Sequence, residues 1–231
     1  MPTNSADSTH DITNGIDGSM SGTTVTTVTD PANVSTPPGR IGGVVLAAGM
    51  STRFEAGNKL LVEIGGEALV RHATKTMLAS PIEEVVVVLG YDRQAVRETL
   101  SELDVEFVLN DDYAAGQSTS VRAGIEAARE RDWDACVFAL GDMPDVSPDS
   151  VERLVQAYAA GRGSIVAAAY DRERGNPVLF DAVHFDTLAG VEGDTGGRGL
   201  IIENDDMVLV ETDDPGVVRD IDRHDDVNRS E

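Results

Sequence analysis

Short apolar segments alternate with segments of helical periodicity along most of this chain, and this alternation restricts the folds open to it. Residues 41–48, 85–89, 105–109, 135–140, 164–169 and 207–211 are predicted strands, and most of them lack polar alternation. Residues 174–180 are predicted to form a turn followed by a short strand. Uninterrupted apolar strands are typical of a parallel sheet buried on both faces. Apolar residues recur at helical spacing in 67–80 and 93–103, and again after Gly116 and Ser147. The sequence therefore predicts an α/β fold, a single doubly wound, Rossmann-like domain with a mostly parallel sheet.

The first 40 residues differ from the rest in composition. They are rich in Thr, Ser, Asp, Asn and Gly, contain few large apolar residues and end in Pro37-Pro38-Gly39. Such a segment buries too little apolar surface to order itself. We predict a disordered tail over residues 1–40 and a folded domain over 41–228. No segment approaches the roughly 18 apolar residues that span a bilayer, and no secretory signal pattern opens the chain, so we expect a cytoplasmic protein.

The charge balance limits the kinds of binding partner that we expect for this protein. Lys and Arg total 18 against 41 Asp and Glu, a formal net charge of -23, which argues against nucleic acid or an anionic membrane as the main partner. Few lysines, abundant aspartates and 4% aromatic residues favour a halophilic protein whose acidic surface is solvated at high salt. The alternative is an acidic cytosolic enzyme without that adaptation. Cys136, the single cysteine, lies in an apolar run and is predicted to be a buried core thiol.

A loop after the first predicted strand carries the pattern of a polyphosphate site. It contains Gly49, Ser51, Arg53, Gly57 and Lys59, so it offers unobstructed backbone N–H groups and two positive charges. A Walker A loop is excluded because Lys59 is neither preceded by Gly nor followed by Ser or Thr. A dinucleotide fingerprint is excluded because no G-x-G-x-x-G triplet follows Gly49. The alternative is an ordinary strand-to-helix turn with two surface cations.

Two further segments place polar groups at predicted element ends. Gly116, Ser118 and Ser120 in GQSTS begin a helix, where N–H groups and the helix dipole favour an anion; with Arg122 we interpret them as a nucleotide contact, although either hydroxyl alone is more simply an N-cap. Asp142 follows a buried strand in LGDMP. A carboxylate there suits Mg²⁺, which takes few carboxylates together with phosphate oxygens. The alternative is an aspartate that caps a turn.

Five strings occur in order: LAAG-x-S-x-R with Lys-Leu-Leu, GQSTS, LGDMP, GNPVLF and GD-x-G-x-R. Together they resemble the molybdenum cofactor cytidylyltransferases of the MobA-like NTP transferase superfamily, which usually carry a D-I-D string further on, as this chain does at residues 220–222. The resemblance covers residues 41 to about 226 and implies the nucleotide-diphospho-sugar transferase type of fold. It implies transfer of a nucleotidyl group from an NTP to the phosphate of molybdopterin or its molybdenum form. The LAAG string favours CTP as this NTP. Pyrophosphate is released, Mg²⁺ is the cofactor, and a molybdoenzyme or its chaperone is an implied partner.

The resemblance also implies roles for individual residues. Catalysis is assigned to Arg53, Lys59 and Asp142, and the metal to Asp142 and Asp222, with Asp220 as the alternative second ligand. The assigned residues for the nucleotide are Leu46, Ala47, Ala48, Gly49, Ser51, Arg53, Lys59, Gly116, Ser118 and Ser120, and those for the acceptor are Gly175, Asn176, Pro177 and Arg198. After the D-I-D string this chain has Arg223-His224 where the family usually has Thr-Pro, which weakens the local match.

Two alternative functions stay open at this point. One is another nucleotidyltransferase, which takes GTP with molybdopterin or joins a nucleotide to a sugar or polyol phosphate. The other is a nucleotide-binding module without turnover, which the altered segment after Asp222 favours. Mg²⁺-dependent release of pyrophosphate separates an enzyme from such a module.

Overall fold

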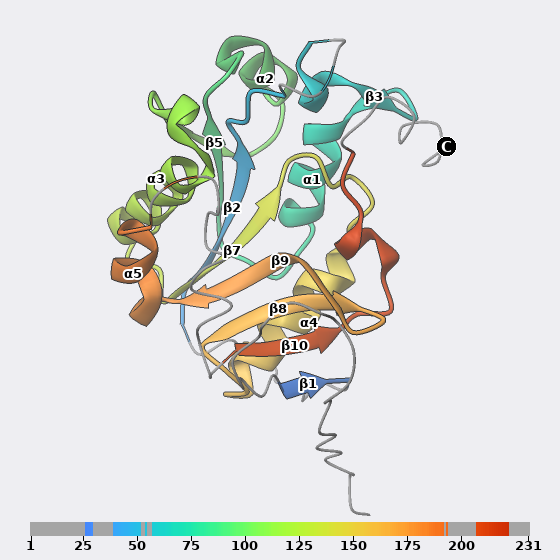
Figure 1. The fold of residues 1–231 in the computed structure, drawn as a ribbon, viewed down its shortest axis with the longest axis vertical. Helices are drawn as coiled ribbons and strands as arrows, with labels where there is room; N and C mark the ends of the chain where they lie inside the picture. The colour runs from blue at the N-terminus through green and yellow to red at the C-terminus, as the bar shows by residue number, and fades with distance from the viewer. Residues whose placement is uncertain are drawn as a thin grey trace, which may run out of the picture.

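The computed structural model describes residues 26–29, 39–51, 54, 57–191, 193 and 207–221. Their centre is an eight-stranded sheet in the order β1-β10-β8-β9-β7-β2-β5-β6, with a separate two-stranded ribbon of β3 and β4 (Figure 1). The strands are β1 Thr26–Val28, β2 Ile41–Ala47, β3 Glu63–Ile64, β4 Glu67–Ala68, β5 Val85–Leu89, β6 Glu106–Leu109, β7 Ala135–Leu140, β8 Ile165–Tyr170, β9 Glu173–Asp181 and β10 Met207–Glu211. The predicted α/β fold with a mostly parallel sheet is confirmed.

Helices cover both faces of this sheet. They are α1 Leu69–Leu78, α2 Arg93–Thr99, α3 Gln117–Glu130, α4 Pro148–Ala159 and α5 Phe185–Ala189, and the short 3₁₀ turns are η1 Lys59–Leu61, η2 Tyr113–Ala115, η3 Ala182–His184 and η4 Pro215–Val218. The helix expected over 67–80 is shorter, because Glu67 and Ala68 pair with β3 as a strand. None of the helices in the described ranges is long and apolar enough to cross a membrane.

Two cores explain why the strands lack polar alternation. In β5, Val85, Val87 and Leu89 pack with side chains of α1, α2 and α4 on one face. Val86 and Val88 pack on the other face with α3 and α5. Successive side chains of a strand point to opposite faces, so a strand between two helical layers is apolar at every position. Cys136 belongs to the second core and is fully buried, as predicted, and burial raises the pKa of its thiol.

Strand β9 departs from the predicted arrangement. It lies antiparallel between β7 and β8 (Figure 1), whereas residues 174–180 were expected to form a turn and then a short strand. The turn lies earlier, at Asp171 and Arg172, which both have positive φ, and it joins β8 directly to β9 as a hairpin. The GNPVLF string is therefore part of the strand itself.

Strand β1 corrects the prediction that residues 1–40 are a disordered tail. Thr26–Val28 pair in parallel with Val208–Val210 of β10, so the prediction is wrong for these residues. An edge strand leaves a row of unpaired backbone groups, and the β-branched TTV segment is suited to pair with it. The other residues of the segment lie outside the described ranges, apart from Thr29, Gly39 and Arg40.

Candidate functional site

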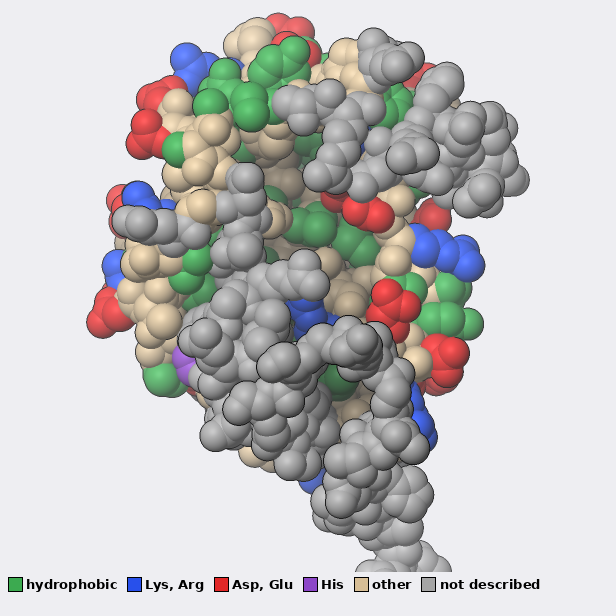
Figure 2. Space-filling model, in the orientation of Figure 1, with side chains coloured by type: hydrophobic (Ala, Val, Ile, Leu, Met, Phe, Trp, Pro, Cys, Tyr) green, Lys and Arg blue, Asp and Glu red, His purple; other side chains and the backbone are tan. Residues whose placement is uncertain are grey.

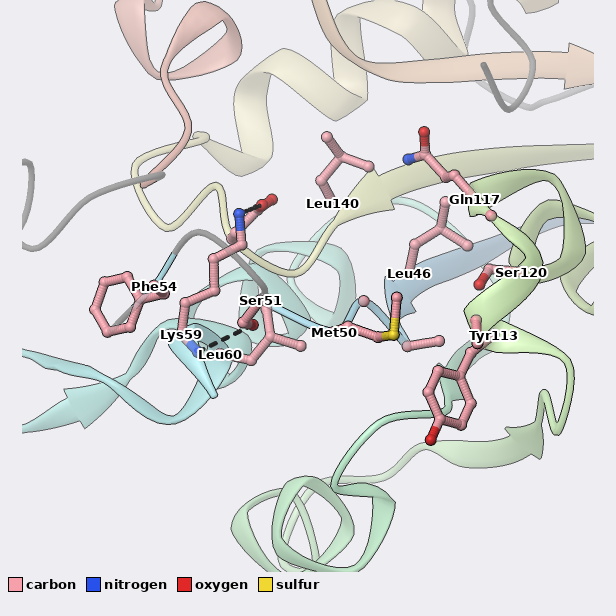
Figure 3. A pocket seen from close by; sticks show the side chains of 15 residues that line it. Leu46, Met50, Ser51, Phe54, Lys59, Leu60, Tyr113, Gln117, Ser120 and Leu140 are labelled. Atoms are coloured by element: carbon pink, nitrogen blue, oxygen red, sulfur yellow. Dashed lines mark hydrogen bonds and ion pairs between the residues drawn. The ribbon is translucent and has the colours of Figure 1, made fainter. Parts of the chain in front are cut away.

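A cavity of about 500 Å³ opens where β2 and β7 end and α3 begins (Figure 3). Open α/β sheets bind ligands at the carboxyl ends of their strands. The wall is formed by Leu46, Ala48, Gly49, Met50, Ser51, Phe54, Lys59, Leu60, Tyr113, Ala114, Gly116, Gln117, Ser120, Leu140 and Asp142. The cavity therefore combines the loop after β2, the start of α3 and the turn after β7, which the sequence singled out separately.

Backbone and side-chain hydrogen bonds close the loop after β2. Ser51 has a φ of 52°, and its Oγ accepts from Lys59 N at 3.1 Å and lies 3.4 Å from Asn58 Oδ1. Asn58 Oδ1 also accepts from Leu60 N at 3.1 Å and caps η1. A Cβ built on Gly49 would meet nothing within 4 Å. The loop thus fixes Lys59 in the cavity wall and leaves the backbone at Gly49 open to a ligand.

Lys59 and Asp142 form an ion pair in the wall of this cavity. Their Nζ and Oδ2 atoms are 2.5 Å apart, and the side chains are 17% and 15% exposed. Asp142 is carried by the turn after β7, where Gly141 N donates to Leu46 O at 3.0 Å. A Cβ at Gly141 would lie 3.1 Å from that same oxygen. Glycine therefore lets the turn run close against β2 and brings the carboxylate to the lysine.

The surroundings of Asp142 fit a divalent cation in part. Its carboxylate already faces one cation, and its backbone oxygen accepts from Ile221 N at 3.1 Å. No group of three or more His, Cys, Asp or Glu side chains gathers among the described residues. A hard cation that keeps water and substrate phosphate oxygens as ligands needs only one or two carboxylates. Asp220 is exposed next to Ile221, while Asp222 lies outside the described ranges.

The first turns of α3 form the opposite wall (Figure 3). Gly116 is the N-cap with a φ of 115°, and no side chain caps this helix. Neither Ser118 nor Ser120 is thus an N-cap. Ser120 lines the cavity, whereas Ser118 is 1% exposed, is not part of the cavity wall, and donates its backbone N–H to Gly193 O. Asn110 Nδ2 donates to Ser120 Oγ at 3.0 Å.

Arg122 has a different role from the one expected. The sequence placed it with GQSTS at the nucleotide, but its Nε donates to Ala189 O at 3.0 Å and one of its terminal nitrogens to Val191 O at 3.4 Å. That interpretation is wrong, because the guanidinium holds the end of α5 and the residues that follow it against α3. Helical position explains it, since a residue two places after Ser120 points to a different side of the helix.

The remaining predicted residues lie apart from the cavity or outside the described ranges. Ala47 is buried in the core. Gly175, Asn176 and Pro177 belong to β9, and the latter two border a space of only about 10 Å³ with Met143 behind the Asp142 turn. Arg53, Arg198 and Asp222 fall outside the described residues, as does the helix expected after Gly193. These roles stay predictions.

Several wall residues were not singled out from the sequence, among them Phe54, Tyr113 and Ala114. Tyr113 packs edge-on against Tyr91, with ring centroids 6.4 Å apart. A Cβ at Gly90 would lie 2.7 Å from the Cβ atoms of both Ala48 and Tyr113, so glycine there lets η2 approach the loop after β2. Met50, Leu60, Gln117 and Leu140 also line the cavity and lie within the motif strings, whereas Phe54, Tyr113 and Ala114 lie outside them.

Comparison with known proteins matches residues 43–208 to a family model described as a MobA-like NTP transferase domain. The nicotine blue oxidoreductase of Paenarthrobacter nicotinovorans is 34% identical over 189 residues, which cover 78% of this chain and 91% of that protein. A nucleotidyl transferase from Methanothermobacter thermautotroptrophicus superposes with a TM-score of 0.70 at 28% identity, covering 82% and 95% of the two chains. Rv0371c of Mycobacterium tuberculosis H37Rv, in complex with manganese, gives 0.71 at 26% identity, covering 83% and 97%.

Proposed function

This chain belongs to the MobA-like NTP transferase family and is a nucleotidyltransferase, and from that premise we propose that it transfers the cytidylyl group of CTP to the phosphate of molybdopterin or its molybdenum form. The observation that carries the proposal is the meeting of Lys59, Asp142 and the open backbone at Gly49 in one cavity. A cation and a carboxylate beside free backbone groups suit a triphosphate and its counter-ion. Ala48 in the LAAG string supports CTP as the donor.

The reaction needs positioning and charge neutralisation more than a nucleophile from the protein. An oxygen of the acceptor phosphate attacks the α-phosphorus in line, the bond to the β-phosphate oxygen breaks, and pyrophosphate leaves. In the proposal, Lys59 donates to phosphate oxygens and offsets charge that develops on the leaving group, with Arg53 of the same loop as a second cation. The two serine hydroxyls in the described wall, on Ser51 and Ser120, are both hydrogen-bonded within the chain.

The proposed metal is Mg²⁺, held by Asp142 and Asp222. Ile221 N is bonded to Asp142 O, which supports this pair because Asp222 is the next residue in the chain. The metal would neutralise phosphate charge when bound. The Rv0371c relative was solved in complex with manganese, a divalent ion of similar oxygen preference.

The acceptor is proposed to bind beside the Asp142 turn. Asn176 and Pro177 line the same small space as Met143, the residue after Asp142, and Arg198 would supply a cation for the acceptor phosphate. The redox reaction in the name of the Paenarthrobacter relative is not part of the proposal. The loop after β2 lacks the glycine spacing of a dinucleotide site, and phosphate chemistry accounts for both charged groups in the described wall.

The test is a panel of CTP, GTP, UTP and ATP against molybdopterin and common sugar phosphates, with MgCl₂ and KCl present and pyrophosphate measured. We expect pyrophosphate release with CTP and molybdopterin. For Lys59→Met or Asp142→Asn we expect kcat to fall by about 10²- to 10³-fold. Lys75→Met and Asp186→Asn are matched controls, because both residues are surface partners in ion pairs outside the cavity.

Each other outcome overturns a defined part of the proposal. Release with GTP instead of CTP would overturn the donor assignment. Release only with a sugar phosphate would overturn the acceptor. Nucleotide binding without pyrophosphate release under any combination would refute transfer and favour a binding module. Normal turnover by Lys59→Met or Asp142→Asn would refute the roles of these two side chains.

A further inference from the structure

Asn110 links the end of the sheet to the cavity wall without touching the cavity itself. It follows β6 directly, is 6% exposed, and is not part of the wall. Its backbone N donates to Leu89 O at 2.8 Å, which extends the pairing of β5 and β6 by one residue. The side chain is therefore held between the strand ends and the first turns of α3, where a buried amide must find partners for its polar atoms.

The orientation of this amide follows from its partners. Asp112 N, a donor only, lies 3.0 Å from Asn110 Oδ1, so the oxygen must be on that side. The nitrogen then faces α3 and donates to Thr119 Oγ1 at 2.8 Å and to Ser120 Oγ at 3.0 Å. Both hydroxyl oxygens accept from the same amide group.

The hydroxyl hydrogens of Thr119 and Ser120 are used differently. The Thr119 hydroxyl donates to Gly116 O at 2.8 Å, so its hydrogen is used within the helix. Ser120 Oγ has no acceptor among the residues that the structure describes, and Ser120 lines the cavity. Because Asn110 occupies one lone pair of Ser120 Oγ, the hydrogen is left to point towards a ligand.

We infer that Asn110 is a positioning residue of the nucleotide site, which makes Ser120 a hydrogen-bond donor to an acceptor atom of the bound NTP. The inference rests on the proposed function, since it requires that the cavity binds a nucleotide. Asn110 and Ser120 act as a relay of fixed polarity: the amide donates to the hydroxyl, and the hydroxyl donates to the ligand. An acceptor in place of the amide nitrogen would reverse this polarity.

Asn110→Asp tests the polarity with almost no change in shape. Its carboxylate accepts from both hydroxyls, so the Ser120 hydrogen turns away from the cavity and its lone pairs face the nucleotide. We expect the Kd of the preferred NTP, measured by equilibrium dialysis on the full chain, to rise by about tenfold, the effect of losing one hydrogen bond. Ser120→Ala should cause a similar rise.

The decisive comparison repeats Asn110→Asp in a Ser120→Ala background. Without the Ser120 hydroxyl, Asn110 can no longer orient a donor towards the ligand. Asn110→Asp should therefore alter Kd by less than twofold in this background. Thr119→Val is the matched control, since it removes the other hydroxyl bonded to Asn110 and should leave Kd within twofold. If Asn110→Asp does not fold, Asn110→Ala takes its place in the comparison. It should weaken nucleotide binding when Ser120 is present and have no effect in the Ser120→Ala background.

The outcomes separate this inference from the proposed function. If the unchanged protein binds none of the four NTPs, the proposed function fails. If it binds one of them and Asn110→Asp leaves Kd unchanged, the relay is refuted. A tenfold loss of affinity that persists in the Ser120→Ala background would also refute it, because the loss would then come from the added negative charge or from the packing of α3, and not from the Ser120 hydroxyl.

Discussion

The ion pair between Lys59 and Asp142 allows a prediction whose size follows from the structure. Two unit charges 2.5 Å apart attract by about 7 kcal/mol at an effective dielectric constant of 20, but desolvation of both groups cancels much of this gain. Removal of one partner from a buried pair typically costs about 3–5 kcal/mol. Because the two side chains retain 17% and 15% exposure, we expect Lys59→Met to lower the free energy of unfolding by about 3 kcal/mol.

The assay is urea unfolding at constant ionic strength, with Lys75→Met as the comparison. Lys75 pairs with Glu67, but its side chain is 47% exposed, so its loss should cost at most about 1 kcal/mol. The double variant Lys59→Met/Asp142→Asn should be more stable than the sum of the single changes predicts, by about 2 kcal/mol, because the stranded carboxylate is gone. Equal costs for Lys59→Met and Lys75→Met, together with additive single changes, would refute this reasoning.

The same variants test whether Asp142 binds the metal. In Lys59→Met the carboxylate has lost its cation, so a divalent ion should replace it and restore stability. A metal concentration of 100 times Kd contributes about 2.7 kcal/mol. MgCl₂ should therefore stabilise Lys59→Met and leave the double variant unchanged, with KCl adjusted to hold ionic strength constant. Equal stabilisation of both variants would show that the ion binds elsewhere.

Three further predictions concern packing, salt and pH. Gly175→Ala should destabilise the fold by about 3 kcal/mol in urea unfolding, since its Cβ would lie 2.0 Å from Val217 O; Gly190→Ala, with 3.5 Å to its nearest atom, should stay within about 1 kcal/mol. With a net charge of -23, the melting temperature should fall steeply as KCl is lowered, and indifference to salt would refute halophilic adaptation. Burial and the 2.6 Å hydrogen bond to Asp181 raise the pKa of Tyr158, so the native state keeps its proton where the unfolded chain loses it. Stability should fall as pH rises above about 10, and Tyr158→Phe should reduce that slope.

Periodicity was sufficient to predict the layers of this fold because burial on both faces leaves a strong pattern. Six apolar segments predicted as strands, 41–48, 85–89, 105–109, 135–140, 164–169 and 207–211, correspond to β2, β5, β6, β7, β8 and β10 within one or two residues. Strand direction leaves no such pattern. An antiparallel strand between two helical layers is as apolar as a parallel one, so the sequence did not reveal that β9 runs against its neighbours. The pairing of Thr26–Val28 with β10 depends on a free sheet edge, which also has no local signal.

The site could be predicted where its residues stand next to glycine at strand ends. Gly49, Lys59 and Asp142 lie in or beside such turns, and they share one cavity. Asn110 could not be found in this way, because its importance comes from the direction of its amide and from the partners of two hydroxyls on another element. Arg122 was misplaced for a similar reason, since the side of a helix that a cation faces depends on what packs there.

The register of the sheet accounts for how these separate turns reach one place. Leu46 pairs with Leu140 in β2 and β7, so the two strands end at the same level and their loops leave the sheet side by side. Strand β9 runs the other way, with Val178 opposite Phe138, and its beginning therefore lies where β7 ends. Strand β9 lies beside β7 in Figure 1, and its antiparallel direction places Asn176 and Pro177 near the edge where β7 ends, an edge that a parallel strand would reach only at its end. A shift of one residue in either pairing would turn alternate side chains to the opposite face and separate the turns, so the buried apolar register determines the geometry of the polar site.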